Sequence, residues 1–303
     1  MTLKTNFLGY EIKAPITTAS GTFGYGECYR NYFDPNELGM LTTKGITLEP
    51  RSGNPQIRLA EVKNGLINSI GLENPGFDYF KRNIIPTFKN FTIPIIVNIN
   101  GKTIEEYLAI AKLINELPEV HIAELNISCP NVKEGGILFG TNLDLTRKVV
   151  RAVRGVLTKK KLIVKLSPNV TDIKQFAKVC EEEQADGLSL INTIPAMKIN
   201  LQTKKPVLAN KIGGLSGDCI KPIAVRMVYE VYSAVKIPII GMGGISSVGD
   251  ALEFLMAGAA VIAVGTGLFN NPSLVLEIKA GLQKYCQENN LKNISEIVGA
   301  AHR

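Results

Sequence analysis

Residues 162–192 read LIVKLSPNVTDIKQFAKVCEEEQADGLSLIN, and this stretch shows the alternation that decides the fold. It begins with an apolar run at 162–167 and ends with a second one at 187–192. The segment between them, 172–183, carries apolar residues at intervals of three and four, which is the spacing of one face of an α-helix. The stretch therefore predicts a strand, an amphipathic helix and a second strand.

The same alternation extends along the chain and predicts a (β/α)8, or TIM, barrel. Continuous apolar strands that alternate with helices are typical of a parallel sheet buried on both faces, and eight of them close a barrel. An open doubly wound sheet is the alternative, but no Gly-x-Gly-x-x-Gly motif follows the first strand. The expected strands are 16–20, 40–44, 93–98, 122–128, 162–167, 187–192, 237–241 and 260–266. The expected helices are 103–117, 143–157, 172–183, 220–235 and 247–256.

One segment interrupts this alternation between the second and third expected strands. Residues 46–91 are far longer than an ordinary β–α connection and contain turn-forming residues at 49–55 and 74–76. Long structured insertions tend to be lids or binding loops. We predict one domain spanning residues 1–303, in which the inserted segment 46–91 covers the active site as a lid and includes a helix near 77–88.

The composition limits the class of protein. A chain of 303 residues with 45% hydrophobic and 20% charged residues can bury a large core and is not disordered. The 34 basic and 27 acidic residues give a net charge of +7, which we interpret mainly as a solvated basic surface. No zinc-knuckle spacing or interleaving of aromatic and basic residues is present, so we expect no nucleic-acid partner.

The cysteines and the apolar runs indicate a compartment. The five cysteines are an odd, widely spaced set without Cys-x-x-Cys, which argues against a disulfide framework and against a metal or iron–sulfur site in this chain. The N-terminus lacks an apolar signal core, and no apolar run approaches the roughly 20 residues that a bilayer requires. We expect a cytoplasmic protein with no membrane contact.

Polar residues follow the expected strands. Because the carboxyl ends of barrel strands form one rim, where active sites lie, these side chains should surround one site. An asparagine at a strand end could equally start a turn or cap a helix. Two lysines that close apolar strands are harder to explain as structure, since lysine is rarely buried unpaired, and they predict a large anionic or electron-accepting ligand. The rim residues are Ser20, Lys44, Asn98, Asn100, Asn126, Ser128, Lys165, Ser167, Asn192 and Thr193.

Glycine-rich loops follow the last two expected strands. Residues 241–246 precede a helix that begins near Ser247, and residues 264–267 precede a second short helical stretch. Glycine lets the backbone approach a phosphate, and the N–H groups at a helix N-terminus favour its charge. The loops after strands seven and eight are the usual phosphate position in TIM barrels. Together with the glycine loop 213–217, they predict a phosphorylated cofactor or substrate.

Cys129 is the candidate for proton or nucleophilic chemistry. It follows the fourth expected strand at the rim and begins a loop with glycines at 135 and 136 that could move as a lid. A thiol beside polar groups suits a nucleophile or a general base. The alternative, a small buried hydrophobic residue, better suits Cys180 and Cys286 on expected helices. His121 lies at the bottom of the fourth strand and His302 in the tail, so neither histidine reaches the rim.

Six segments, in this order, resemble a known family: Ser20–Gly24, Asn68–Gly76, Asn126–Asn131, Val164–Pro168, Gly213–Gly217 and Gly241–Ile245. Over nearly its whole length the chain resembles the flavin-dependent dihydroorotate dehydrogenases of pyrimidine (UMP) biosynthesis. A cysteine at 129, where the membrane-bound branch has serine, implies class 1. The stretches at 20–26 and 49–55 resemble the NAD-linked class 1B catalytic subunit. The fumarate-dependent class 1A enzyme is the nearer alternative.

This resemblance implies an FMN cofactor at the rim. Lys165 would place a fixed cation beside the flavin pyrimidine edge and stabilise the anionic reduced form. The resemblance further implies a partner subunit that carries FAD and a [2Fe-2S] cluster and passes electrons to NAD+. Two catalytic and two electron-transfer chains would form a heterotetramer around a homodimeric core. The implied cofactor-binding residues are Ser20, Lys44, Gly45, Asn98, Asn126, Lys165, Ile191 and Gly217, with Gly243, Gly244, Gly265 and Thr266 at the phosphate.

The resemblance also implies the substrate site and the reaction. Cys129 would remove a proton from C5 of (S)-dihydroorotate as hydride leaves C6 for the flavin, giving orotate. Asparagines suit the substrate because each offers a donor and an acceptor to a ring edge of N–H and C=O groups. The implied substrate-binding residues are Lys44, Asn68, Ser69, Ile70, Gly71, Leu72, Asn126, Asn131, Asn192 and Thr193.

Two other classes of function compete with this interpretation. A flavin-free barrel, such as a sugar-phosphate isomerase or aldolase, would use Lys44 or Lys165 as a Schiff base and the glycine loops for the substrate phosphate. A non-catalytic binding scaffold would use none of the rim chemistry. Bound flavin that dihydroorotate reduces would separate these alternatives.

Overall fold

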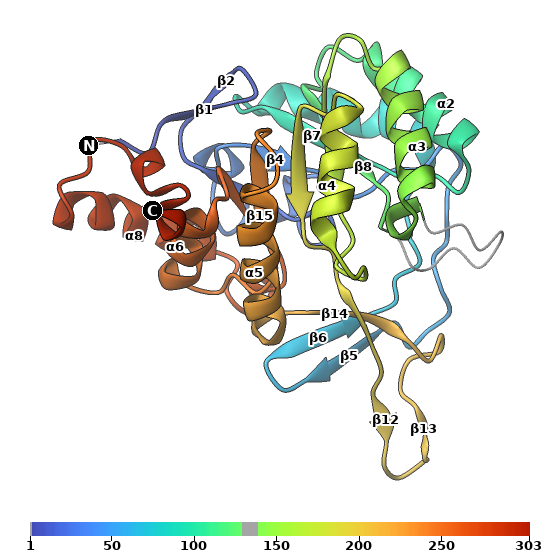
Figure 1. Ribbon diagram of the computed structural model, residues 1–303. Helices are drawn as coiled ribbons and strands as arrows, with labels where there is room; N and C mark the ends of the chain where they lie inside the picture. The colour runs from blue at the N-terminus through green and yellow to red at the C-terminus, as the bar shows by residue number, and fades with distance from the viewer. Residues whose placement is uncertain (1, 129–138) are drawn as a thin grey trace.

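A computed structural model describes residues 2–128 and 139–303, and its centre is an eight-stranded parallel sheet (Figure 1). The strand order is β3-β16-β15-β10-β9-β8-β7-β4. All eight expected strands are present, and each is shorter than the apolar run that predicted it. The strands are β3 (Ile16–Thr18), β4 (Leu41–Thr42), β7 (Ile95–Ile99), β8 (Ile122–Asn126), β9 (Lys161–Lys165), β10 (Gly187–Leu190), β15 (Ile239–Met242) and β16 (Val261–Val264).

The strands at the two ends of this order, β3 and β4, meet and complete the barrel. The backbone N–H groups of Gly39 and Met40 both donate to the carbonyl of Ile16, at 2.9 and 3.3 Å. Farther along, the hydroxyl of Thr18 donates to the carbonyl of Thr42 at 3.3 Å, so a side chain replaces part of the backbone ladder. The predicted (β/α)8 architecture is therefore confirmed.

Helices surround the sheet. The five amphipathic stretches form α2 (Ile104–Asn115), α3 (Leu143–Val156), α4 (Ile173–Glu182), α5 (Lys221–Tyr232) and α6 (Val248–Ala257). Side chains at 103, 142, 172 and 247 cap four of them by accepting from backbone N–H groups, which explains where those helices begin. The short α7 (Gly267–Asn270) and the long α8 (Leu274–Glu288) complete the ring, and α8 carries Cys286, which was expected on a helix.

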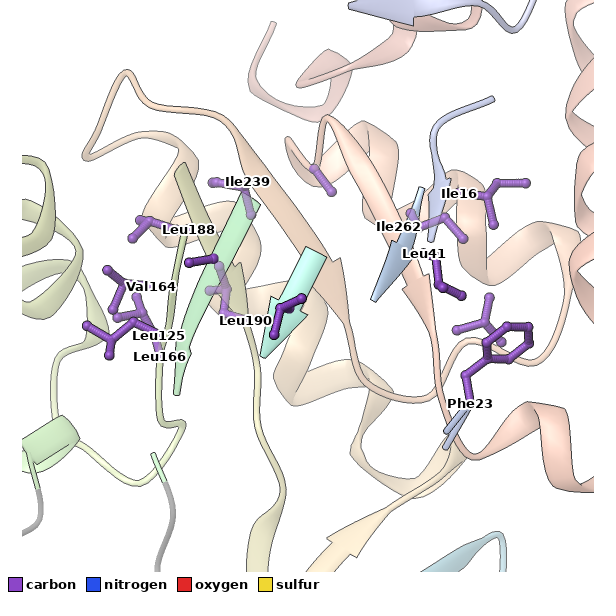
Figure 2. Packing of buried hydrophobic residues seen from close by; sticks show 14 of the residues in the cluster. Ile16, Phe23, Leu41, Leu125, Val164, Leu166, Leu188, Leu190, Ile239 and Ile262 are labelled. Carbon is purple, nitrogen blue, oxygen red and sulfur yellow. The ribbon is translucent and has the colours of Figure 1, made fainter. Parts of the chain in front are cut away.

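The alternation of side chains along each strand builds two apolar layers. Leu125, Val164 and Leu188 point outward from neighbouring strands and gather under the helices, as Figure 2 shows. Residues at the alternate positions, such as Ile122 on β8 and Ile163 on β9, point inward and fill the lower half of the barrel. The hairpin of β1 (Thr5–Phe7) and β2 (Tyr10–Ile12) closes that lower end with apolar side chains.

The inward positions become polar toward the carboxyl ends of the strands. Asn98, Glu124, Asn126, Lys165 and Ser189 are all buried and lie two or four residues beyond the inward apolar layer. Because these groups share the interior, each must find a polar partner or face a ligand. The upper half of the barrel is therefore built for binding, while the lower half is built for stability.

Two excursions from the barrel pair with each other. The segment 46–91 contributes β5 (Leu59–Val62) and β6 (Gly65–Asn68), which join β14 (Gly213–Ser216) and β11 (Ile194–Ala196) in an antiparallel sheet ordered β11-β14-β6-β5. Between β11 and β14, the hairpin of β12 (Ile199–Asn200) and β13 (Lys205–Pro206) projects away from the barrel (Figure 1).

The helix expected near 77–88 is present as a continuous helical stretch of mixed type. It starts as α1 (Gly76–Tyr79), continues as a π-helical turn at Phe80–Ile84 and ends as a 3₁₀ stretch at Ile85–Asn90. Pro86 is the second residue of the last part and cannot donate a backbone hydrogen bond to the preceding turn, which is consistent with the change of helix type there. Within the described residues, every helix is too short or too polar to cross a lipid bilayer.

Candidate active site

A cavity of about 300 Å³ opens at the carboxyl ends of the barrel strands. Its floor and walls come from strand ends, including Asn98 on β7, Asn126 on β8 and Lys165 on β9. The small antiparallel sheet forms another wall through Leu66 and Asn68. The volume is at the lower end of the range of small-molecule sites.

The structure brings most of the predicted site residues together around this cavity. Ser69 is an exception, because it is buried behind the wall and its hydroxyl accepts from Asn54 Nδ2 at 3.0 Å. Cys129 and Asn131 lie outside the described residues. The predicted residues that line the cavity are Ser20, Lys44, Gly45, Asn68, Ile70, Gly71, Leu72, Asn98, Asn126, Lys165, Ile191, Asn192, Thr193, Gly217, Gly243, Gly244, Gly265 and Thr266.

Two lysines bring positive charge to the cavity. Lys165 is only 5% exposed, and its Nζ donates to Ser20 Oγ at 3.3 Å. Lys44 also lines the cavity, held by a backbone hydrogen bond to Gly24 of 2.7 Å. Among residues 2–128 and 139–303, neither lysine forms an ion pair with a carboxylate. Since charge in a low-dielectric site requires compensation, the pair favours an anionic or electron-rich ligand.

Amide side chains form part of the cavity surface, which we call the amide wall. Asn68 Nδ2 donates to the Gly214 carbonyl at 3.1 Å, which ties β6 to β14 at the cavity surface. Asn192 Nδ2 donates to Ser128 Oγ at 2.5 Å, and its Oδ1 accepts from the Thr193 backbone at 2.8 Å. These contacts hold the amides in fixed directions, as recognition of a planar polar ring requires.

The loop at 70–73 forms the rim next to Asn68. Leu72 has φ 56°, a left-handed conformation that is uncommon for a residue with a side chain. Asn74, which is buried, stabilises it: its Nδ2 donates to the Leu72 carbonyl at 2.7 Å and to Thr47 Oγ1 at 2.8 Å. The turn-rich stretch packs underneath, with Asn54 N donating to the Ile70 carbonyl at 2.9 Å. The loop therefore presents its backbone to the cavity in a fixed shape.

The two glycine-rich loops close the far end of the cavity. Gly243 and Gly244 have φ values of 125° and 83°, which only glycine adopts readily. A Cβ on Gly244 would lie 2.8 Å from Lys221 Cβ and 2.9 Å from the Gly217 carbonyl. Ser247 caps the following helix, α6, so the N-terminus of α6 lies directly after this loop. Such bare backbone before a helix is a cradle that suits a phosphate.

A charged pair fixes this cradle from behind. Lys221 Nζ donates to Asp250 Oδ1 at 2.7 Å, and Asp250 Oδ2 accepts from the Ser246 backbone at 3.0 Å and from Ser247 Oγ at 2.8 Å. Burial raises the pKa of Asp250, but the hydrogen bonds from Lys221, Ser246 and Ser247 outweigh it, so the pKa lies below its usual value. Asp250 is therefore ionised at neutral pH and holds the loop in place.

Replacing Gly244 by alanine should weaken cofactor retention without unfolding the protein. The added Cβ meets Lys221 and the Gly217 carbonyl, and the positive φ costs about 1–3 kcal/mol in addition. For the flavin that the resemblance implies, we expect a roughly tenfold or greater loss of affinity, measured by flavin released on dilution. The matched control is Gly155→Ala on α3, where a Cβ meets nothing within 4 Å. Equal flavin retention in the two variants would contradict the phosphate assignment.

Several cavity residues were missed by sequence reasoning. Ser216 lies in the glycine loop 213–217, and its Oγ is 2.7 Å from Thr266 Oγ1. Thr22 lies in the quoted segment 20–24, so for both residues the motif itself was the signal. Leu59 and Phe269 line the mouth of the cavity although they are half exposed, and no pattern marked them.

Neither of the two histidines lines the cavity. His121 lies at the start of β8, as predicted, where its Nδ1 accepts from the Ile95 backbone at 3.1 Å and its ring packs edge-on against Tyr10. His302 stacks on Tyr229 with ring centroids 3.8 Å apart. Among residues 2–128 and 139–303, no three His, Cys, Asp or Glu side chains form a group that could hold a metal ion.

Comparison with known proteins gives one consistent result. Residues 2–286 match the sequence profile of a family described as dihydroorotate dehydrogenase. A protein of Brachyspira hyodysenteriae named dihydroorotate dehydrogenase B (NAD(+)), catalytic subunit, is 56% identical over 99% of both chains. A protein of the same name from Desulforamulus reducens is 52% identical over 95% of this chain and 94% of its own.

A solved structure supports the fold. The crystal structure of DHODH in complex with ferulenol, from Eimeria tenella, superposes with a TM-score of 0.81 and covers 99% of this chain and 89% of its own. Its sequence identity with this chain is 22%, so this likeness bears on the barrel architecture and not on the ligands.

Proposed function

The chain belongs to the dihydroorotate dehydrogenase family, and from this premise we propose how its cavity performs the family's reaction. The reaction is the oxidation of dihydroorotate to orotate in pyrimidine biosynthesis. Relatives at 47–56% identity carry the name of the NAD(+)-linked B form, so the chain is of class 1B and not the fumarate-dependent class 1A. The family assignment also removes the isomerase, aldolase and scaffold alternatives.

One observation carries the proposal for the site. A single cavity combines a glycine cradle, two lysines without carboxylate partners among the described residues, and several amide side chains. A sugar-phosphate site needs the cradle and a cation, but it does not need a wall of amides. A flavin together with a planar cyclic amide uses all three features.

The residues present fit FMN. The cradle at Gly243 and Gly244 would hold its phosphate, together with Gly265 and Thr266, because all four residues line the cavity and the first loop leads into the N-terminus of α6. Lys165 would contact the ring, and Ser20, Gly45, Asn98, Ile191 and Gly217 would surround the ring and the ribityl chain. A bound flavin would supply the two-electron acceptor of the oxidation.

The substrate would lie against the amide wall. Lys44 would bind the carboxylate of dihydroorotate, while Asn68, Asn126, Asn192 and Thr193 would bind the ring amides. The backbone of loop 70–72 would close over the ring, since Asn74 holds that loop in its strained shape. The resemblance also assigns Asn131, which lies outside the described residues, to the substrate. Ser69 would support the substrate site indirectly, because its hydroxyl accepts from Asn54, whose backbone N–H donates to the Ile70 carbonyl.

Cys129 is the proposed base, on the sequence argument. It would remove the proton from C5 of dihydroorotate as the hydride leaves C6, which balances the two-electron oxidation to orotate. The other four thiols support this assignment by contrast. Burial raises the pKa of Cys28, Cys180, Cys219 and Cys286, so none of them is activated as a thiolate.

The relatives' name, catalytic subunit, implies a partner subunit. We propose that this partner carries FAD and a [2Fe-2S] cluster, and that two such chains join a homodimer of this chain in a cytoplasmic heterotetramer. We further propose that residues 1–303 form one domain with segment 46–91 as the cover of the site. A single apolar cluster that joins the barrel to Phe77, Phe80 and Phe88 of that segment supports this.

The acceptor experiment tests the proposed function. Orotate formation from dihydroorotate is measured with NAD+ or with fumarate, using the purified chain alone and together with its electron-transfer subunit. We expect turnover with NAD+ only when both subunits are present, and no turnover with fumarate. Fumarate-dependent orotate formation by the chain alone would contradict the class 1B assignment.

A further inference from the structure

A buried carboxylate at the centre of the barrel has no role in the reaction described above. Glu124 lies in the middle of β8, points inward and is 1% exposed. Its Oε1 accepts from Ser189 Oγ and its Oε2 from Asn98 Nδ2, both at 2.6 Å. Among the described residues it forms no ion pair. Burying such a group is expensive, and an apolar side chain would pack there at lower cost.

A line of hydrogen bonds runs from Glu124 to the cavity. Asn100 Nδ2 donates to Asn98 Oδ1 at 2.8 Å, and Asn126 Nδ2 donates to Asn100 Oδ1 at 2.7 Å. Asn126 Oδ1 accepts from Ser128 Oγ at 2.8 Å. The line then reaches Asn192, whose Nδ2 donates to Ser128 Oγ. In every hydrogen bond of this line, the donor is the residue farther from Glu124 and the acceptor is the residue nearer to it.

The carboxylate fixes one end of this line, and the backbone N–H of Ser128, which donates to Asn126 Oδ1 at 3.2 Å, fixes the other end. A carboxylate only accepts, so the amide of Asn98 must turn Nδ2 toward Glu124 and Oδ1 toward Asn100. Asn100 must then turn Nδ2 toward Asn98, and Asn126 must do the same toward Asn100. One flipped amide would place donor against donor or acceptor against acceptor inside a buried network, which is costly.

The direction decides what the cavity offers to a ligand. Asn126 Oδ1 already accepts two hydrogen bonds, from Ser128 N and Ser128 Oγ. Asn126 can therefore still donate one hydrogen bond, from the second N–H of Nδ2. Asn98 can likewise donate one more from its own Nδ2. Both residues line the cavity. The line therefore presents donors, which select carbonyl or carboxylate oxygens on the ligand.

From this geometry we infer that Glu124 is a positioning residue that fixes the amides of Asn98, Asn100 and Asn126 in the donor-outward direction. The inference rests on the proposed function, in which the cavity binds flavin and dihydroorotate. It predicts that Glu124 controls affinity and selectivity for ligand oxygens, although it does not itself line the cavity.

The test is the variant Glu124→Met in the flavin-loaded protein. Methionine fills similar space but leaves Asn98 Nδ2 without its acceptor. We expect the Kd of orotate, measured by the shift in the visible flavin spectrum, to rise roughly ten- to a hundredfold. For an orotate analogue with an amino group in place of one ring carbonyl, the Kd should rise much less. The preference of the cavity for orotate over this analogue therefore falls. Glu124→Gln should recover much of the loss, since its amide oxygen can accept from Asn98.

The control separates positioning from stability. Glu183 is also a buried carboxylate, but it pairs with Arg147 and Arg151 on the helix layer, away from the cavity. Glu183→Met should lower Tm and leave the Kd of orotate unchanged. If Glu124→Met does not fold, Asn100→Leu breaks the same line and should give the same loss of selectivity.

Two results would overturn the inference, and they differ. Orotate affinity and selectivity in Glu124→Met or Asn100→Leu within twofold of the unsubstituted protein would refute the role of Glu124 alone. Failure of the unsubstituted flavin-loaded protein to bind orotate at all would refute the proposed function, and the inference with it.

Discussion

Replacing Lys165 by methionine should lower kcat for dihydroorotate oxidation by about 10²–10³-fold, the usual loss when one preorganised electrostatic group is removed. The lysine is buried at the cavity floor, with Ser20 Oγ 3.3 Å from its Nζ. Methionine keeps the length and the apolar stem of the side chain. It removes the positive charge that would stabilise the anionic reduced flavin. The same substitution should lower the reduction potential of the bound flavin, measured by equilibration with a reference dye.

A lysine on the same strand provides the control. Lys161 lies at the other end of β9, where its Nζ pairs with Asp186 Oδ1 at 2.9 Å. Lys161→Met should affect stability modestly and leave both kcat and the flavin potential unchanged. If Lys165→Met keeps kcat within a few-fold of the Lys161→Met value, Lys165 is not the cation that assists the oxidation.

Replacing Cys129 by alanine should abolish turnover almost completely while flavin stays bound. A positioned general base contributes about 10²–10⁴-fold, and alanine offers no substitute for the thiolate. Because a thiol acts as a base only after losing its proton, and a free thiol titrates near 8.5, activity of the unsubstituted protein should rise with pH through the neutral range. Initial rates of flavin reduction between pH 6 and about pH 9 measure this dependence.

The comparison variant is Cys28→Ala, which removes an exposed thiol whose Sγ donates to the Phe23 carbonyl at 3.7 Å. It should keep the activity and the pH profile of the unsubstituted protein. Near-full activity of Cys129→Ala at neutral pH would remove Cys129 from the role of base.

The barrel was predictable because its signals are local. Each strand is a short apolar run, each helix has its own periodicity, and the residue that closes each run marks the rim. Lys44 and Lys165 were identified in this way, since a lysine at the end of an apolar strand conflicts with burial unless a ligand is present. The same reasoning located the glycine loops at the far end of the cavity.

The small antiparallel sheet was not predictable in the same way. Its strands, such as β11 and β14, are three and four residues long, and β6 pairs with β14 across about half of the chain. Such pairing depends on tertiary contacts and leaves no periodic pattern. The length of segment 46–91 predicts an insertion, but no pattern after β10 predicts β11 and β14, the strands of the sheet that this segment joins.

Glu124 and Ser69 illustrate two kinds of contact that the sequence does not reveal. Glu124 stands in the middle of an apolar strand, and inspection of strand ends overlooked the inward alternation of Ile122, Glu124 and Asn126. The resemblance assigns Ser69 to the substrate, and the structure adds that its hydroxyl accepts from Asn54 Nδ2, a contact that the sequence alone does not reveal. A charged residue at an alternate position of a buried strand was the signal that could have revealed the network.

The most direct test of the central claim, that this one cavity joins a flavin to dihydroorotate, is the half-reaction without any acceptor. The purified flavin-loaded chain is mixed anaerobically with dihydroorotate, and the visible absorbance of the flavin is followed in a stopped-flow instrument. We predict rapid loss of the oxidised flavin band with one orotate formed per flavin. Purified protein without flavin, or flavin that stays oxidised with excess dihydroorotate, would contradict the account.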